Sequence, residues 1–186
     1  MKKNYAVTAF SLFFFIAIIS GASYAENRKG AFTFNPHIGG YVFEGNQDIN
    51  SGPVIGVGLG YNVTERIGLE GVFNYVDTDA SSRDRKPDVE AYLYRLDFLY
   101  HFMPDGDLVP YLSAGAGAIN VKTDVGDNDD ETNMMVDGGA GVKVFIKDYL
   151  ALRGEVRYVR DVEDDFNNFM YTIGLNFMFG GIEKVE

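Results

Sequence analysis

The run of residues 169–179 constrains the fold more than any other part of this sequence. Its odd positions are large and apolar or aromatic, from Phe169 to Phe179, and its even positions are small, polar or flexible. A repeat of two residues predicts a β-strand with one apolar face and one different face. The chain must therefore bury that aromatic face, either in a protein core or in lipid.

Residues 1–25 have the organisation of an export signal. Lys2 and Lys3 precede an uncharged apolar stretch at 5–19, and small residues, with Ser23 and Ala25 at the positions that a signal peptidase reads, precede Glu26. This pattern predicts a secretory signal that is cleaved before Glu26. The alternative is a membrane-anchoring helix, but the stretch is shorter than the roughly 18 to 20 residues that a spanning helix needs. The sequence has no cysteine, which excludes a lipid-anchored cysteine and a disulfide framework.

The remaining chain is acidic and rich in aromatic residues. Without the two lysines of the signal it has 14 basic and 27 acidic residues, a net charge of −13. This balance argues against nucleic acid as a partner, because binding to its phosphates needs basic patches. The whole sequence has 15 Phe, 12 Tyr and 22 Gly. An exported chain of this kind is typical of one all-β domain with long polar loops.

The alternation of the last run recurs along the whole domain. Eight strands are predicted, at 32–43, 53–63, 67–76, 89–102, 108–121, 134–146, 149–160 and 169–179. In seven of them the apolar face can be assigned. The segment 108–121 is so rich in Gly and Ala that its facing stays open.

The connections between these strands alternate in length. Those at 64–66, 103–107 and 147–148 are short, and those at 44–52, 77–88, 122–133 and 161–166 are longer and polar. Tight periplasmic turns and longer extracellular loops between strands of about ten residues are typical of a transmembrane β-barrel. An even number of strands places both termini in the periplasm, as expected for an exported chain.

A soluble β-sandwich or lipocalin would also alternate, but with its apolar face inward. Here the opposite face has seven charged residues: Glu70, Arg95, Asp97, Lys143, Arg153, Glu155 and Arg157. In addition, the five aromatic residues of the strand at 89–102 would crowd a soluble core. We therefore predict an all-β, eight-stranded antiparallel up-and-down transmembrane β-barrel at 26–180, followed by a short periplasmic tail at 181–186.

Several segments resemble one known family. Residues 139–145 through 152–156 resemble the sixth and seventh strands of the OmpA-type eight-stranded outer-membrane barrel, and residues 110–117 and 174–180 resemble its Pro-Tyr strand and its closing strand. The resemblance covers essentially the whole exported chain and implies an outer-membrane protein. It also implies that the barrel-assembly machinery recognises the closing strand, with Tyr171, Phe177 and Phe179 as the residues concerned. Many members continue into a periplasmic domain that grips peptidoglycan, so this sequence is either a barrel-only member or the barrel of a longer protein.

The seven inward charges are the candidate functional site. Glu70, Lys143 and Arg153 are expected near the periplasmic side of the lumen, and the other four nearer its middle. Eight strands enclose a bore that side chains about fill, which favours a static polar core. The family resemblance implies the alternative, a gate whose ion pairs block a pore and rearrange to admit ions.

The outward aromatic residues are expected to form two girdles in contact with outer-membrane lipid and lipopolysaccharide. The periplasmic set is Phe32, Phe34, Tyr61, Tyr100, Phe102, Phe177 and Phe179; the other set is Tyr75, Tyr92, Tyr158 and Phe169. Inward glycines at 56, 58, 60, 139 and 141 are expected to make room for charged side chains in a strongly curved sheet.

Cofactor and metal chemistry find little support in the sequence. The acidic run at 124–131 lacks the order of a calcium-binding EF-hand loop. A solvated loop is the favoured interpretation, and the alternative is that this run and the acidic cluster at 163–165 hold divalent cations that bridge to lipopolysaccharide phosphates. His37 and His101 are expected to face inward, and no Ser or Asp is placed to form a triad with either. We expect no enzyme and no cofactor.

The predicted protein is a monomeric structural protein of the outer membrane that stabilises the envelope and displays acidic extracellular loops. The alternatives are a narrow or gated channel and an adhesin that acts through loops 78–88 and 122–133. A soluble periplasmic binder is the remaining hypothesis.

Overall fold

The computed structural model describes residues 26–42, 51–79, 88–123, 131–163 and 167–182. The predicted signal at 1–25, most of the longer connections and the end of the predicted tail lie outside these residues. Among the described residues, no helix is both long enough and apolar enough to cross a membrane.

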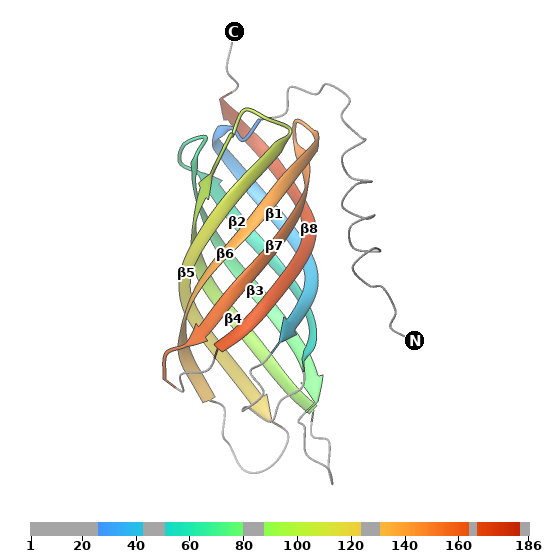
Figure 1. Cartoon of the computed structure of the whole chain (residues 1–186), viewed down its shortest axis with the longest axis vertical. Helices are drawn as coiled ribbons and strands as arrows, with labels where there is room; N and C mark the ends of the chain where they lie inside the picture. The colour runs from blue at the N-terminus through green and yellow to red at the C-terminus, as the bar shows by residue number, and fades with distance from the viewer. Residues whose placement is uncertain (1–25, 43–50, 80–87, 124–130, 164–166, 183–186) are drawn as a thin grey trace, which may run out of the picture.

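Eight antiparallel strands form one closed barrel (Figure 1). Their bounds are β1 Lys29–Val42, β2 Gly52–Asn62, β3 Ile67–Asp79, β4 Asp88–His101, β5 Leu108–Thr123, β6 Glu131–Lys147, β7 Leu150–Asp161 and β8 Asn167–Ile182. Each strand pairs with the next in the sequence, and β8 pairs with β1 to close the sheet. The predicted all-β, eight-stranded antiparallel barrel is confirmed.

Several strands are longer than predicted. β3 and β4 stay paired as far as Asp79 and Asp88, and β6 begins at Glu131. The backbone ladder thus extends past the point where side-chain alternation stops, and the connections predicted at 77–88 and 122–133 shorten to 80–87 and 124–130. β8 continues to Ile182, two residues into the segment predicted as a tail.

The two ends of the barrel differ in their connections. The turn end has the three short connections, at 63–66, 102–107 and 148–149, together with the start of β1 and the end of β8 (Figure 1). The loop end has the connections at 43–51, 80–87, 124–130 and 162–166, each of which is longer than the turn-end connections next to it in the sequence. The predicted alternation of short and long connections is confirmed.

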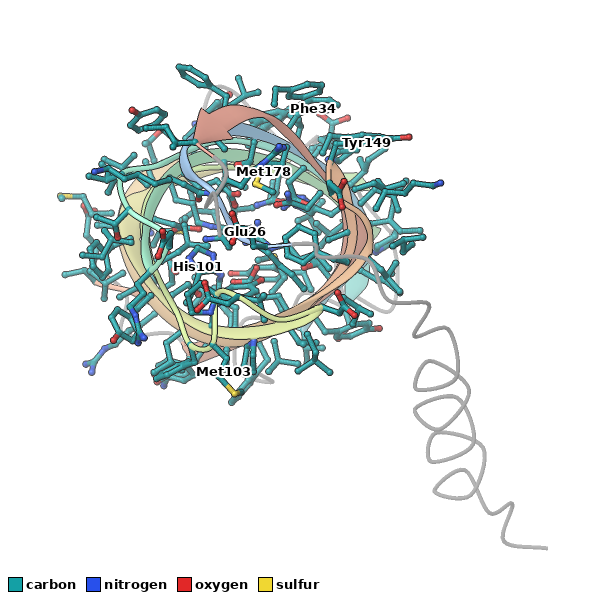
Figure 2. The ribbon with its side chains drawn as sticks, turned by 90° about the horizontal axis from the view of Figure 1, so that it is seen from above. Glu26, Phe34, His101, Met103, Tyr149 and Met178 are labelled. Atoms are coloured by element: carbon teal, nitrogen blue, oxygen red, sulfur yellow. The ribbon has the colours of Figure 1, made fainter. Side chains whose placement is uncertain are left out.

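The apolar faces point outward, as predicted for seven strands. Along β4, for example, Tyr94, Leu96 and Phe98 are exposed, and Arg95 and Asp97 between them are buried. Figure 2, which views the barrel from the turn end, shows Phe34 and Tyr149 outside the wall and His101 and Met178 inside it. The facing of β5, which its sequence leaves open, follows from pairing. Gly115 lies opposite Asp97, so the odd-numbered residues of β5 point into the lumen.

The lumen has a polar middle between two apolar layers. The loop-end layer consists of nine buried side chains from all eight strands: Tyr41, Val54, Val76, Ala91, Leu93, Ile119, Met135, Val159 and Met170. The turn-end layer is smaller and consists of Ala31, Val109, Phe145, Ala151 and Met178. The sequence does not predict these layers, because their residues break the alternation of polar and apolar positions.

Candidate functional site: the charged lumen

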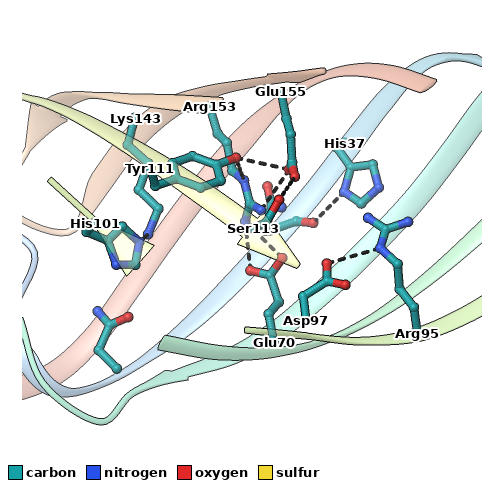
Figure 3. Close-up of polar contacts among 12 residues, drawn as sticks. His37, Glu70, Arg95, Asp97, His101, Tyr111, Ser113, Lys143, Arg153 and Glu155 are labelled. Carbon is teal, nitrogen blue, oxygen red and sulfur yellow. Dashed lines mark hydrogen bonds and ion pairs between the residues drawn. The ribbon is translucent and has the colours of Figure 1, made fainter. Parts of the chain in front are cut away.

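An ion pair between opposite walls anchors the polar middle of the lumen. The Nη1 atom of Arg153 on β7 donates hydrogen bonds to both carboxylate oxygens of Glu70 on β3, at 2.9 and 2.7 Å (Figure 3). Both side chains are buried. β3 and β7 are not neighbours in the sheet, so this pair crosses the bore and joins the two walls.

Tyr111 and Ser113 on β5 join this pair to Glu155. Arg153 Nη2 donates to Glu155 Oε2 at 2.9 Å, and Arg153 Nε donates to the Tyr111 hydroxyl at 2.6 Å. That hydroxyl in turn donates to Glu155 Oε2 at 3.0 Å, and Ser113 Oγ donates to Glu155 Oε1 at 2.9 Å. Charged hydrogen bonds of this kind are among the stronger ones in proteins.

Arg157 extends the cluster toward the loop end. Its guanidinium pairs with Glu155, with Asp137 and, at 2.8 Å, with Asp97 Oδ2. Arg95 Nε donates to the same oxygen of Asp97 at 3.0 Å. Asp137 was absent from the predicted set, although it shares the inward parity of Lys143 on β6. With Asp137, the ion-paired cluster has four carboxylates and three arginines, and the low dielectric of a protein interior favours such pairing of buried charges.

The structure therefore brings six of the seven predicted residues into one ion-paired cluster and leaves Lys143 apart. Lys143 is buried and forms no ion pair with any carboxylate in the described part of the chain. Its Nζ lies 2.9 Å from His101 Nε2, 3.4 Å from Asn27 Oδ1 and 5.9 Å from the centre of the Tyr111 ring. The alternation along β6 correctly placed Lys143 in the lumen. Its position along the barrel axis brings it next to His101.

Both histidines lie inside the barrel, as expected. His37 Nε2 is 2.6 Å from Asn74 Oδ1, and His101 Nδ1 is 3.3 Å from the carbonyl oxygen of Arg66. No group of three metal-binding side chains occurs within the described ranges. The predicted acidic run at 124–131 lies outside those ranges, except for Glu131.

Some buried polar atoms of the cluster have no hydrogen-bond partner among the described residues. They are Asn74 Nδ2, Arg95 Nη1, Asp97 Oδ1, Asp137 Oδ2 and Arg157 Nε. Each is a donor or an acceptor close to the ion pairs, so the cluster has spare capacity for hydrogen bonds in its loop-side half.

The three predicted residues of the closing strand lie on the outer face of β8. Tyr171 lies across Gly40 of β1, its direct partner in the sheet. Phe177 is 6.2 Å from Phe34 between ring centres, and Phe179 lies opposite Phe32. All three are thus at the seam where the sheet closes.

Aromatic rings gather near both ends of the outer wall. At the turn end, ring centres are 5.0 Å apart in the pair Phe32–Tyr61 and 5.1 Å apart in the pair Tyr100–Phe102. At the loop end, the corresponding distances are 5.3 Å for Tyr75–Tyr92 and 5.4 Å for Tyr158–Phe169. A closed sheet with an apolar exterior, an aromatic band at each end and a charged interior defines a transmembrane β-barrel.

Comparison with known families assigns the barrel to one of them. Residues 11–179 match the family described as the outer membrane protein beta-barrel domain, and the chain belongs to that family. The outer membrane protein Omp38 of Acinetobacter baumannii is 27% identical over 173 residues, which cover 80% of this chain and 48% of that protein. The chain thus spans about half the length of the curated relatives that it matches.

Solved barrels show the same fold. The N-terminal β-barrel domain of Pseudomonas aeruginosa OprF is 21% identical with a TM-score of 0.58, over 82% of this chain and 99% of that one. Neisserial surface protein A is 15% identical with a TM-score of 0.67, over 83% of this chain and 100% of that one. The predicted resemblance to outer-membrane barrels of the OmpA type is confirmed.

Proposed function

We propose that this chain is a structural protein of the outer membrane that stabilises the envelope and displays its longer connections to the outside. The observation that supports this proposal is the filled lumen. Ion pairs join opposite walls in its middle, nine apolar side chains close the loop side of them, and five apolar side chains lie on the turn side. A barrel whose lumen is filled by side chains leaves little space for solutes, which favours a structural role over a pore.

The partners that we propose follow from the residues on the outer face of the barrel. Its apolar wall contacts lipid and lipopolysaccharide, and the rings at β8 present the closing strand to the barrel-assembly machinery. The protein is proposed to act as a monomer, because a closed barrel has no free sheet edge for pairing. The loops proposed for recognition lie largely outside the described residues.

Planar-bilayer conductance, combined with heat-modifiable migration on a gel, tests the structural role. We expect folded barrels without discrete conductance steps. Arg153→Ala should lower the thermal stability and leave the conductance unchanged, because it removes a cross-wall ion pair but neither apolar layer. Regular conductance steps from the unmodified protein would contradict the structural role.

A narrow gated channel is the second candidate. Its support is the polar middle itself, in which basic and acidic groups pair with one another and five buried polar atoms keep unused hydrogen-bonding capacity. If those ion pairs close a pore, Arg153→Ala should raise the conductance rather than only lower the stability. The same variant therefore separates the two candidates.

A further inference from the structure

The segment preceding β1 folds over the turn end of the lumen. Gly30 has φ +75°, a left-handed conformation that favours glycine, and it redirects the chain where β1 begins. Asn27, three residues earlier, is only 1% exposed. Viewed from the turn end in Figure 2, Glu26 lies within the outline of the barrel wall.

Asn27 is held by two turns of the barrel. Its backbone N–H donates to the carbonyl oxygen of Pro104, in the connection between β4 and β5, at 2.8 Å. Its side-chain Nδ2 donates to the carbonyl oxygen of Glu65, in the connection between β2 and β3, at 2.6 Å. One residue thus bridges two of the three short connections.

The same side chain covers the interior. Asn27 Oδ1 accepts hydrogen bonds from Asn62 Nδ2 at 3.1 Å and from Lys143 Nζ at 3.4 Å. Asn62 Nδ2 also donates to the carbonyl oxygen of Arg28 at 3.1 Å and lies 3.8 Å from the sulfur of Met178 in the turn-end layer. Asn27 therefore lies directly above Lys143 and the turn-end layer.

We propose that residues 26–28 form a plug that closes the turn end of the lumen and can be released without unfolding the barrel. Its release would admit solvent to Lys143, to His101 and to the turn-end layer. The loop end is closed differently, by nine side chains anchored in all eight strands. Within the described residues, only the turn end is closed by a segment outside the sheet, and Asn27 forms the hydrogen bonds described above.

Cysteine accessibility tests this proposal, because the chain has no native cysteine. Ala31 in the turn-end layer and Ala91 in the loop-end layer are both 0% exposed, so Ala31→Cys and Ala91→Cys are matched reporters for the two ends. Each is placed in the otherwise unmodified chain and in a chain with Asn27→Ala, and the rate of reaction with a small charged thiol reagent is measured in lipid vesicles.

We expect Asn27→Ala to accelerate the labelling of Ala31→Cys about tenfold or more, because several buried hydrogen bonds are lost. Labelling of Ala91→Cys should stay slow. Gly30→Ala gives a second route to release. Its β-carbon would have no atom closer than 3.9 Å, so its effect comes from backbone strain at positive φ, and it should change labelling in the same direction.

Two results would overturn the plug. One is an unchanged labelling rate of Ala31→Cys when either Asn27→Ala or Gly30→Ala is added. The other is a parallel rise for Ala91→Cys, which would mean general loosening of the barrel. Heat-modifiable migration confirms that each variant is folded. The test does not depend on whether the protein conducts ions, so it stands apart from the proposed structural role.

Discussion

The ring of Tyr111 on β5 lies across Gly141, its direct partner on β6, inside the lumen. A β-carbon at position 141 would collide with the Cζ and Oη atoms of that ring. The missing side chain lets the phenol lie flat against the wall, with its hydroxyl between Arg153 and Glu155. The hydrogen bonds of the charged cluster therefore depend on a glycine that is not charged itself.

Gly141→Ala should lower the free energy of unfolding by about 1–3 kcal/mol, because the added methyl group overpacks the Tyr111 site. Urea unfolding in lipid vesicles measures the change. Gly154→Ala is the matched control, since a β-carbon there has no atom within 4 Å. That control should stay within about 0.5 kcal/mol of the unmodified protein. Equal losses of unfolding free energy in Gly141→Ala and Gly154→Ala would disprove the role of Gly141.

The ion pair between Glu70 and Arg153 should show strong coupling. Glu70→Gln or Arg153→Met alone should cost about 3–5 kcal/mol, because Arg153→Met leaves the buried Glu70 carboxylate without its partner and Glu70→Gln leaves Arg153 with Glu155 as its one remaining ion pair. The double variant should cost at least about 1 kcal/mol less than the sum of the two single changes. The four unfolding free energies form a double-mutant cycle, and simple additivity would show that the contact does not contribute to stability.

A charge on the outer wall should have a cost that depends on depth. Leu96 is 64% exposed near the middle of β4, and Ile55 is 59% exposed toward the loop end of β2. In lipid vesicles Leu96→Arg should cost about 2–4 kcal/mol and Ile55→Arg about 0–1 kcal/mol. If both substitutions were neutral in vesicles, the wall would not face hydrocarbon at these positions.

Variants of Phe179 and Phe32 distinguish an effect on barrel assembly from an effect on stability. They lie opposite each other on β8 and β1, and both are exposed, so Phe179→Ala and Phe32→Ala should lower the stability in vesicles by similar amounts. In cells, only Phe179→Ala should slow the appearance of folded barrel in the outer membrane, as measured by pulse labelling and heat-modifiable migration. Equal delays would leave Phe179 as an ordinary girdle residue.

Much of the architecture could be predicted because it is written in local patterns. The alternation at Tyr92–Phe102 or at 169–179 assigns the outward face directly, since successive side chains of a strand point to opposite sides. The facing of β5 could not be predicted, because the small residues Ala114 to Ala118 do not differ enough to mark a face. Pairing with β4 and β6 decided it.

Most residues of the candidate site could be predicted from the sequence, but not which of them form ion pairs with one another. Parity placed Glu70 and Arg153 in the lumen, yet 83 residues separate them in sequence and only closure of the barrel sets them face to face. Asp137 carried the same parity signal and could have been included. Asn27 carried no such signal, because it lies in a segment without alternation and is buried by turns that come later in the sequence.

The sequence by itself determined the number of strands, the alternating lengths of their connections and the outward placement of residues such as Phe169, Leu175 and Phe179. These follow from a repeat of two residues, which is a property of each strand alone. Only the tertiary structure decided which charges pair, which apolar layers close the lumen and how Asn27 covers Lys143. Those contacts join strands and turns distant in the sequence, so they exist only once β8 has paired with β1.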